Sequence, residues 1–296
     1  MERKKSGLKT LDIVYIILAV LPLIAGIVLK ILFTPESQGI EIKGALIYFT
    51  VKMPFCDLPI TESQVNSLLV ILSVFWLCRF LTNGLTVEGK GKRQIICEWI
   101  VEKTKGLVNS NMGEYFKGFA PFVAAIMALS AFSSLMSLLG LYPPTSDLNI
   151  VAGWAILVFF LITYYKFKCG PVQYLKSFTE PVPFLTPLNV ISEVATPVSM
   201  AFRHYGNILS GSVISVLVAA ALTGLSNLAL GWLPDVFRNI PLLRIGLPAV
   251  LSVYFDVFSG LLQAFIFAML TMLYISGGFP AELYEKRKLK KQKNNI

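Results

Sequence analysis

The stretch "VSMAFRHYGNILSGS", residues 198–212, places Arg203 beside the chain's single histidine, His204, within a hydrophobic segment that runs from about residue 187 to 233. A charged side chain inside a membrane-length apolar segment is costly, and it usually faces protein or water rather than lipid. The stretch therefore predicts a membrane helix on which Arg203 has a function.

The composition of the whole chain is typical of a polytopic membrane protein. Of its 296 residues, 55% are hydrophobic and 15% are charged, and its mean hydropathy is +0.69, which exceeds what a soluble core requires. Because about 20 apolar residues cross a bilayer, uncharged runs locate the spans. Four such segments are 13–29, 63–78, 118–146 and 148–165. Two longer apolar segments, about 187–233 and about 245–276, carry charge within them and bring the number to six. We expect an all-α membrane protein of about six helices, the last two of them long.

Basic residues alternate between the predicted loops. Twenty of the 26 Lys and Arg residues lie before the first span, after the last one, or in the loops that follow the second and fourth spans. The other loops hold four: Lys43, Lys52, Arg238 and Arg244. By the positive-inside rule both termini are cytoplasmic. Membrane topology thus explains the net charge of +9, and no nucleic-acid-binding module is predicted.

The first span has two interpretations. Arg3, Lys4 and Lys5 precede it, as in a signal peptide, but "LPLIAGIVLK" (21–30) offers no convincing cleavage site, so we favour a retained helix. We expect residues 1–33 to form an additional N-terminal membrane helix and residues 34–296 to form a single membrane domain, because no internal repeat or long linker is present. The basic tail and the absence of a transit peptide favour a bacterial plasma membrane.

Residues 94–108, "QIICEWIVEKTKGLV", predict an amphipathic helix that lies along the cytoplasmic interface, with Ile95, Ile96, Trp99, Ile100 and Val108 near one side.

No cofactor or metal site is predicted. "GLTVEGKG" (84–91) nearly spells a phosphate-binding loop, but Gly91 replaces the hydroxyl residue that would hold magnesium, and the stretch follows a membrane helix rather than a strand. The four cysteines form no C-x-x-C pair, so they are interpreted as packing residues.

Two stripes of polar residues follow the last two segments at helical spacing. The first comprises Asn189, Ser192, Thr196, Ser199, Arg203, Asn207 and Ser210, and it becomes apolar from Ile214 onward. The second comprises Ser252, Asp256, Ser259 and Gln263, and it becomes apolar from Ile266 onward. Since the two helices enter the membrane from opposite sides, one stripe opens to the cytoplasm and the other to the outside. Two offset polar routes that do not join are what an ion path with a moving carrier requires.

Two simpler interpretations stay open for these residues. The serines could hydrogen-bond helices together, as small polar residues commonly do in membranes. Arg203 and Asp256 could form a plain salt bridge. A continuous helix over 187–233 would measure about 70 Å against a hydrocarbon core of about 30 Å, so it has to tilt or break.

Five stretches together resemble subunit a of the membrane sector of F-type ATP synthases. They are "NMGEYFKGFAPF" (111–122), "LLGLYPPTSDLN" (138–149), "VFFLITYYKFKCGPVQYLKSFTEP" (158–181), "PLNVISEVATPVSMAFRHYGN" (187–207) and "LLQAFIFAMLTMLYIS" (261–276). The resemblance implies a non-catalytic stator subunit whose two half-channels carry protons or Na⁺ to and from a rotating c-ring. It implies further partners in the b-subunit of the peripheral stalk and, indirectly, the F1 sector, all at the lipid bilayer.

The resemblance also implies roles for single residues. Arg203, with Gly206 and Asn207 behind it, matches the arginine that separates the half-channels and faces the ring carboxylates. Gln263 matches the glutamine facing that arginine, Asp256 an ionisable residue of the inlet, and Glu193 an acidic residue of the outlet. The remaining candidates along the ion path are Ser199, Ser210, Ser212 and His204.

Two of these positions depart from the family pattern. Ser212 stands where many members carry a glutamate or a histidine, and His204 replaces an apolar neighbour of the arginine, so Asp256 is expected to take the larger share of the outer relay. His204 points about 100° from the stripe and could instead fill a gap between helices.

Two other functions predict features that differ from this sequence. An ion-coupled secondary transporter predicts an inverted repeat, which the chain lacks. An intramembrane hydrolase using Ser210 or Ser212 with His204 lacks a triad and a nucleophile elbow. The sequence leaves open whether the ion is a proton or Na⁺.

Overall fold

The computed structural model describes residues 10–34, 44–54, 57–86, 91–179, 182–230, 246–247, 250–279, 285–286 and 289. The predictions for residues 1–9, Lys43, Arg238 and Arg244, and for most of the basic tail, lie outside the described residues.

The described residues confirm an all-α polytopic membrane protein. Six helical stretches are long and apolar enough to cross a membrane: Thr10–Phe33, Glu62–Thr82, Glu114–Leu139, Leu148–Lys168, Pro183–Ser226 and Val250–Gly277. The third stretch ends at Leu139, whereas the sequence predicted that it would extend to residue 146. Gly140 adopts a left-handed φ of 71° directly after Leu139, and Pro143 and Pro144 follow, so the helix cannot continue.

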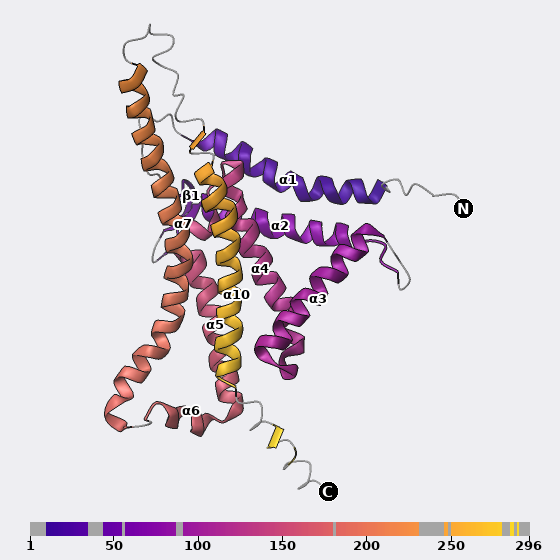
Figure 1. The fold of residues 1–296 in the computed structure, drawn as a ribbon, viewed down its shortest axis with the longest axis vertical. Coiled ribbons are helices and arrows are strands. Elements are labelled where there is room, and N and C mark those ends of the chain that lie inside the picture. Colours follow the sequence, from indigo (N-terminus) through magenta and orange to yellow (C-terminus); the bar gives the residue numbers. More distant parts are fainter. Residues whose placement is uncertain are drawn as a thin grey trace, which may run out of the picture. The chain divides into compact units, whose positions relative to one another are not determined.

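Figure 1 shows the order of the elements. The α-helices are α1 (Thr10–Phe33), α2 (Glu62–Thr82), α3 (Lys92–Met112), α4 (Ala120–Leu135), α5 (Leu148–Cys169), α6 (Pro171–Ser177), α7 (Thr186–Leu230) and α10 (Gly260–Gly277). The 3₁₀ turns are η1 (Glu114–Phe119), η2 (Met136–Leu139), η3 (Pro144–Ser146) and η4 (Pro183–Leu185), and η5 (Val253–Ser259) is a π-helix. The sequence left open whether the long segment from about residue 187 breaks; α7 is continuous over its 45 described residues, Thr186–Leu230.

A short hairpin was not predicted. Strand β1 (Ile47–Val51) pairs antiparallel with β2 (Leu58–Thr61), and β2 leads directly into α2. Strands of five and four residues give too short an alternating pattern to be recognised beside membrane-length apolar runs.

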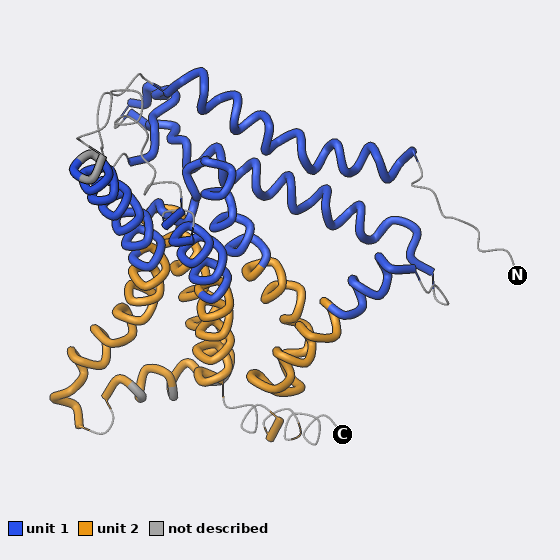
Figure 2. Tube along the Cα trace, turned by 45° about the horizontal axis from the view of Figure 1, so that its top comes forward, with its two compact units in different colours: residues 1–99, 128–147, 206–262 blue, residues 100–127, 148–205, 263–296 orange. Residues whose placement is uncertain are grey.

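The chain divides into two compact units, each assembled from three separate stretches of sequence (Figure 2). Unit 1 contains residues 1–99, 128–147 and 206–262, and unit 2 contains residues 100–127, 148–205 and 263–296. Helices α3, α4, α7 and α10 each pass from one unit into the other. The predictions of an additional first helix and of a single domain stay predictions.

Within unit 1, α1 lies along α2 (Figures 1 and 2). The Ser73 hydroxyl of α2 donates a buried hydrogen bond of 2.6 Å to the carbonyl oxygen of Ala19 in α1. The Tyr15 and Trp76 rings stack with their centroids 6.0 Å apart. The first helix is therefore fastened to the second along its length.

Ion pairs with a buried carboxylate and a partly exposed cation also join the two ends of α1 to the rest of unit 1. Arg93 donates two hydrogen bonds of 2.8 Å to Asp12, whose side chain is 1% exposed. At the other end, the Lys30 ammonium lies 3.3 Å from a carboxylate oxygen of Glu62, which is 2% exposed. Burial, reinforced by the Glu62 carboxylate, raises the pKa of Tyr48 to about 12. Each end of α1 thus supplies the countercharge of a group from another element.

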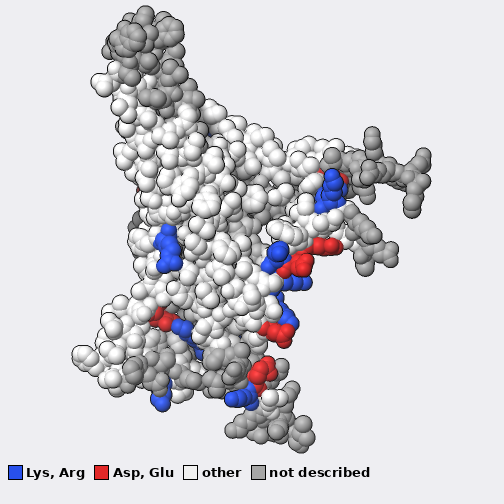
Figure 3. Space-filling model, in the orientation of Figure 1, with Lys and Arg blue, Asp and Glu red and all other residues white. Residues whose placement is uncertain are grey.

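Unit 2 has the larger apolar core, which α3, α4, α5, α7 and α10 share. Its centre is an aromatic cluster in which the Phe116 ring packs edge-on against Tyr165 and Phe279. The predicted interfacial segment lies in α3, which is long enough to cross a membrane but is not among the helices apolar enough to do so. Within this segment, Val108 is buried in the apolar core of unit 2, while the other four apolar residues are exposed: Ile95, Ile96, Trp99 and Ile100. Charged side chains gather over α3 in Figure 3.

The Lys30–Glu62 pair generates a prediction about stability. Lys30→Met leaves the Glu62 carboxylate buried without its countercharge, which we expect to cost about 3 kcal/mol, the lower end for a broken buried pair. The midpoint of thermal unfolding in detergent should therefore fall. Lys52→Met, at an exposed lysine of the hairpin loop, is the matched control and should change little. A Lys30→Met, Glu62→Gln double variant should recover most of the loss, and failure to do so would contradict the charge argument.

Candidate functional site

Arg203 lies on the exposed side of α7, inside a membrane-length segment. Ser192, Ser199 and Phe202 of the same part of the helix are also exposed, whereas Met200 and Ala201 are buried in the core of unit 2. Among the described residues of this unit, no carboxylate lies within ion-pair distance of Arg203; the one described ion pair that α7 makes here belongs to Glu193. The guanidinium is thus presented outward.

His204 points into the protein. It is 0% exposed, and its ring packs edge-on against Phe267 and Trp154, with centroid distances of 5.4 and 6.1 Å. The structure therefore agrees with the interpretation that this residue fills a gap between helices. Its one-residue offset from Arg203 turns it away from the exposed face of α7.

Gln263 is buried, with 5% of its surface exposed, in the first turn of α10. Gln263 and Thr271 are the buried polar side chains among the described residues of α10, and a buried amide needs hydrogen-bonding partners.

Glu193 forms a compact polar cluster with two residues that the sequence did not single out. The Lys166 ammonium of α5 lies 2.5 and 2.8 Å from the two carboxylate oxygens of Glu193. The Tyr174 hydroxyl of α6 donates to the same carboxylate over 3.3 Å. The Lys166 ammonium also lies 5.5 Å from the centre of the Tyr174 ring. Burial raises the pKa of Tyr174, with a further contribution from the Glu193 carboxylate.

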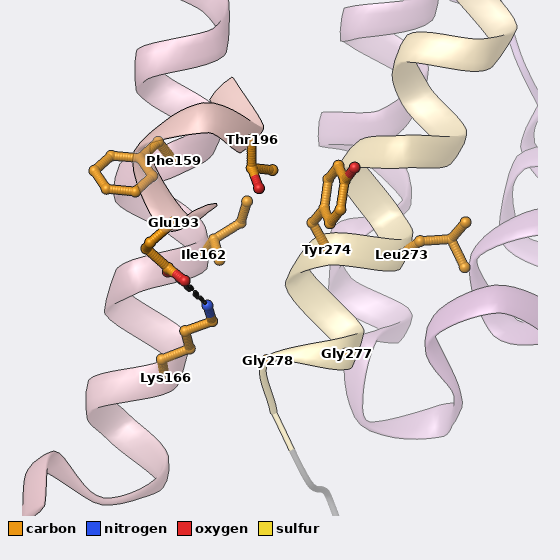
Figure 4. A pocket seen from close by; sticks show the side chains of 9 residues that line it. All are labelled: Phe159, Ile162, Lys166, Glu193, Thr196, Leu273, Tyr274, Gly277 and Gly278. Carbon is orange, nitrogen blue, oxygen red and sulfur yellow. Dashed lines mark hydrogen bonds and ion pairs between the residues drawn. The ribbon is translucent and has the colours of Figure 1, made fainter. Parts of the chain in front are cut away.

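This cluster borders a cavity of about 190 Å³ between α5, α7 and α10 (Figure 4). Glu193 and Lys166 point toward each other, and Thr196 and Tyr274 face the space between α7 and α10. The remaining wall is apolar or glycine, from Phe159, Ile162, Leu273, Gly277 and Gly278. The cavity is large enough for several water molecules, and its lining residues carry one acidic and one basic group.

The other site residues lie in unit 1. The Asn207 side chain donates to the carbonyl oxygen of Ser259 over 3.4 Å and accepts a 3.0 Å hydrogen bond from the Ser259 hydroxyl. The Ser252 hydroxyl donates to Asp256 over 2.5 Å. Ser210 and Ser212 are exposed and donate to carbonyl oxygens of their own helix. Asn207 and Asp256 thus each form a side-chain hydrogen bond with a serine of the second polar stripe.

The second stripe needs a correction. Its spacing assumed an α-helix, but η5 (Val253–Ser259) is a π-helix between Ser252 and Gly260. A π turn contains more residues than an α turn, so positions four apart no longer fall on one face across it. Asp256 and Ser259 both lie in this turn, where a single periodicity does not hold. No sequence signal for the π turn was recognised.

Arg203 and Gln263 belong to unit 2, and Asp256 belongs to unit 1. The alternative of an Arg203–Asp256 salt bridge therefore stays open. Among the described residues, no cluster of three or more metal-ligating side chains occurs.

Comparisons with known proteins agree on one family. The family profile described as the ATP synthase A chain matches residues 64–276. The chain is 34% identical to an ATP synthase subunit a of Priestia megaterium over 235 residues, which cover 74% of this chain and 93% of the relative. It is 31% identical to the Bacillus pumilus protein of that name, over 75% and 93% of the two chains, and 28% identical to the Legionella pneumophila one, over 81% and 94%. The outward-facing arginine on a long membrane helix lies inside the matched region, and the chain belongs to the ATP synthase A chain family.

Proposed function

We propose that the chain is the stator subunit of the ATP synthase Fo sector and provides two offset half-channels for the ions that turn the c-ring. The observation that carries the proposal is the exposed guanidinium of Arg203 within a membrane-length helix of a chain of this family. Exposure of an arginine to lipid near the bilayer centre costs at least about 2.5 kcal/mol. A partner with carboxylates at that depth, such as a c-ring, removes this cost.

Arginine suits the position chemically. Because it stays protonated at physiological pH, it attracts a ring carboxylate without relaying a proton itself. Its fixed charge favours the ionised ring carboxylate, so the ion is released on one side of Arg203 and taken up on the other. Leakage past Arg203 would waste about 2.3 kcal/mol per charge for every 100 mV of membrane potential.

Roles for the remaining residues follow from their surroundings. Asp256, which accepts a hydrogen bond from Ser252 within unit 1, is assigned to the inlet. Gln263 is assigned to the position of the family glutamine that faces the arginine, and Asn207, hydrogen-bonded to Ser259, to the polar stripe of α7. Glu193 and its cavity lie on the outlet side. The exposed Ser199, Ser210 and Ser212 line the path, and we assign His204, packed against Phe267, to holding the orientation of this part of α7.

The proposal includes the setting of the subunit. Its partners are the c-ring, the b-subunit of the peripheral stalk, the lipid bilayer and, through the stalk, the F1 sector, and it carries no catalytic site of its own. The charge distribution supports cytoplasmic termini, and the setting that we propose is a bacterial plasma membrane.

The central experiment removes the guanidinium. Arg203→Ala should abolish ATP-driven ion pumping while the complex still assembles, because nothing then separates the two half-channels. Pumping is measured by fluorescence quenching in proteoliposomes, and assembly by co-purification with the c-ring. Arg79→Ala, at an exposed arginine in the last turn of α2, is the matched control and should pump normally. Normal pumping by an assembled Arg203→Ala complex would exclude the proposed role.

Asp256 is tested by comparing two substitutions. Asp256→Asn should slow ATP-driven pumping severalfold more than Asp256→Glu, since only the glutamate keeps an ionisable group beside Ser252. Glu114→Gln, which removes an exposed carboxylate near Lys117, serves as the control. Equal rates for the two Asp256 variants would remove this residue from the inlet.

A further inference from the structure

The cavity in Figure 4 has its one acidic lining residue already occupied by a cation from the same chain. The Lys166 ammonium contacts both oxygens of the Glu193 carboxylate, at 2.5 and 2.8 Å. The two side chains are only 22% and 20% exposed, so the pair is partly withdrawn from water. A free cation would have to displace this ammonium before it could coordinate Glu193.

Three neighbours fix the position of Lys166. Besides Glu193, the Tyr174 ring lies 5.5 Å from its ammonium. At Gly278, an added Cβ would come within 2.9 Å of Cγ and 3.0 Å of Cε of Lys166, so the lysine stem lies directly against the glycine backbone. Any larger residue at position 278 would push the stem away. The glycine therefore provides the space in which Lys166 reaches Glu193.

The opposite charges also make the cavity lining neutral overall. An unpaired carboxylate in a narrow, partly buried cavity would attract sodium, because charges there are screened less than in bulk water. With Lys166 in place, the lining residues offer no uncompensated acidic group. A proton can still cross such a cavity along water and hydroxyl groups such as that of Thr196, since it needs no coordination shell.

We propose that Lys166 is a specificity-determining residue that keeps the outlet cavity selective for protons by occupying the site on Glu193 that a sodium ion would otherwise take. The inference rests on the proposed function, because it assumes that ions leave through this cavity. It adds a filter within this chain, in a different place from the carboxylates of the ring.

The test compares proton pumping by the whole complex in two salts. Proteoliposomes with the assembled synthase are assayed for ATP-driven acidification in about 100 mM sodium chloride and in the same concentration of N-methylglucamine chloride. The wild type should pump equally in both salts. Lys166→Met should pump about twofold more slowly in sodium, as expected if sodium binds the freed Glu193 with a Kd near that concentration.

Two further variants sharpen the result. Lys168→Met removes a lysine two positions along the same helix that lies over the Tyr164 and Tyr165 rings rather than beside Glu193, and it should leave pumping equal in the two salts. Gly278→Ala keeps every charge but displaces the Lys166 stem, so it should show a sodium effect smaller than that of Lys166→Met. If Lys166→Met does not assemble, Gly278→Ala decides the question.

An equal rate in both salts for Lys166→Met would overturn the inference, as would uptake of radioactive sodium by the wild-type complex. Neither result touches the role of Arg203, whereas continued pumping by Arg203→Ala would refute the proposed function itself. The two failures are therefore distinguishable.

Discussion

The cost of holding a charge in hydrocarbon governs how this structure is built. A charged side chain within a membrane-spanning helix is stable only with a countercharge, water or a protein partner. Asp12 and Glu62 meet this requirement through Arg93 and Lys30, and Glu193 meets it through Lys166. These pairs join elements that are far apart in the sequence, so the same constraint that penalises the charges also specifies which helices pack together.

Arg203 meets the requirement differently. It is exposed on α7, and no carboxylate of the described part of its own unit compensates it. For a chain of the ATP synthase A chain family, this points to compensation by another subunit. The residues behind it are ordered: His204 packs against Phe267 in unit 2, and Asn207 exchanges hydrogen bonds with Ser259 in unit 1. A helix that is held by such contacts and presents one outward charge is well suited to face a partner that moves past it.

The charges of Glu193 and Arg203, both on α7, are compensated in two different ways. At Glu193 a countercharge from the same chain produces a neutral lining, so ions that need coordination are disfavoured there. At Arg203 a countercharge that comes and goes would produce a cycle of binding and release. Helix α7 therefore carries two charges about three turns apart, Glu193, which is paired within unit 2, and Arg203, which no described carboxylate of unit 2 pairs.

The sequence by itself determined the class of fold and the six membrane-length apolar helices, because apolar runs and helical periodicity are local properties of the chain. Its five characteristic stretches also indicated the family. It also singled out Arg203 and Asp256 as candidates, since isolated charges in such runs stand out, and the family resemblance added Glu193. Only the tertiary structure decided that Glu193 pairs with Lys166, that His204 faces inward, and that a π turn holds Asp256. The partners of a charge lie tens of residues away, and a π turn depends on packing around it, so neither leaves a periodic signal in the sequence.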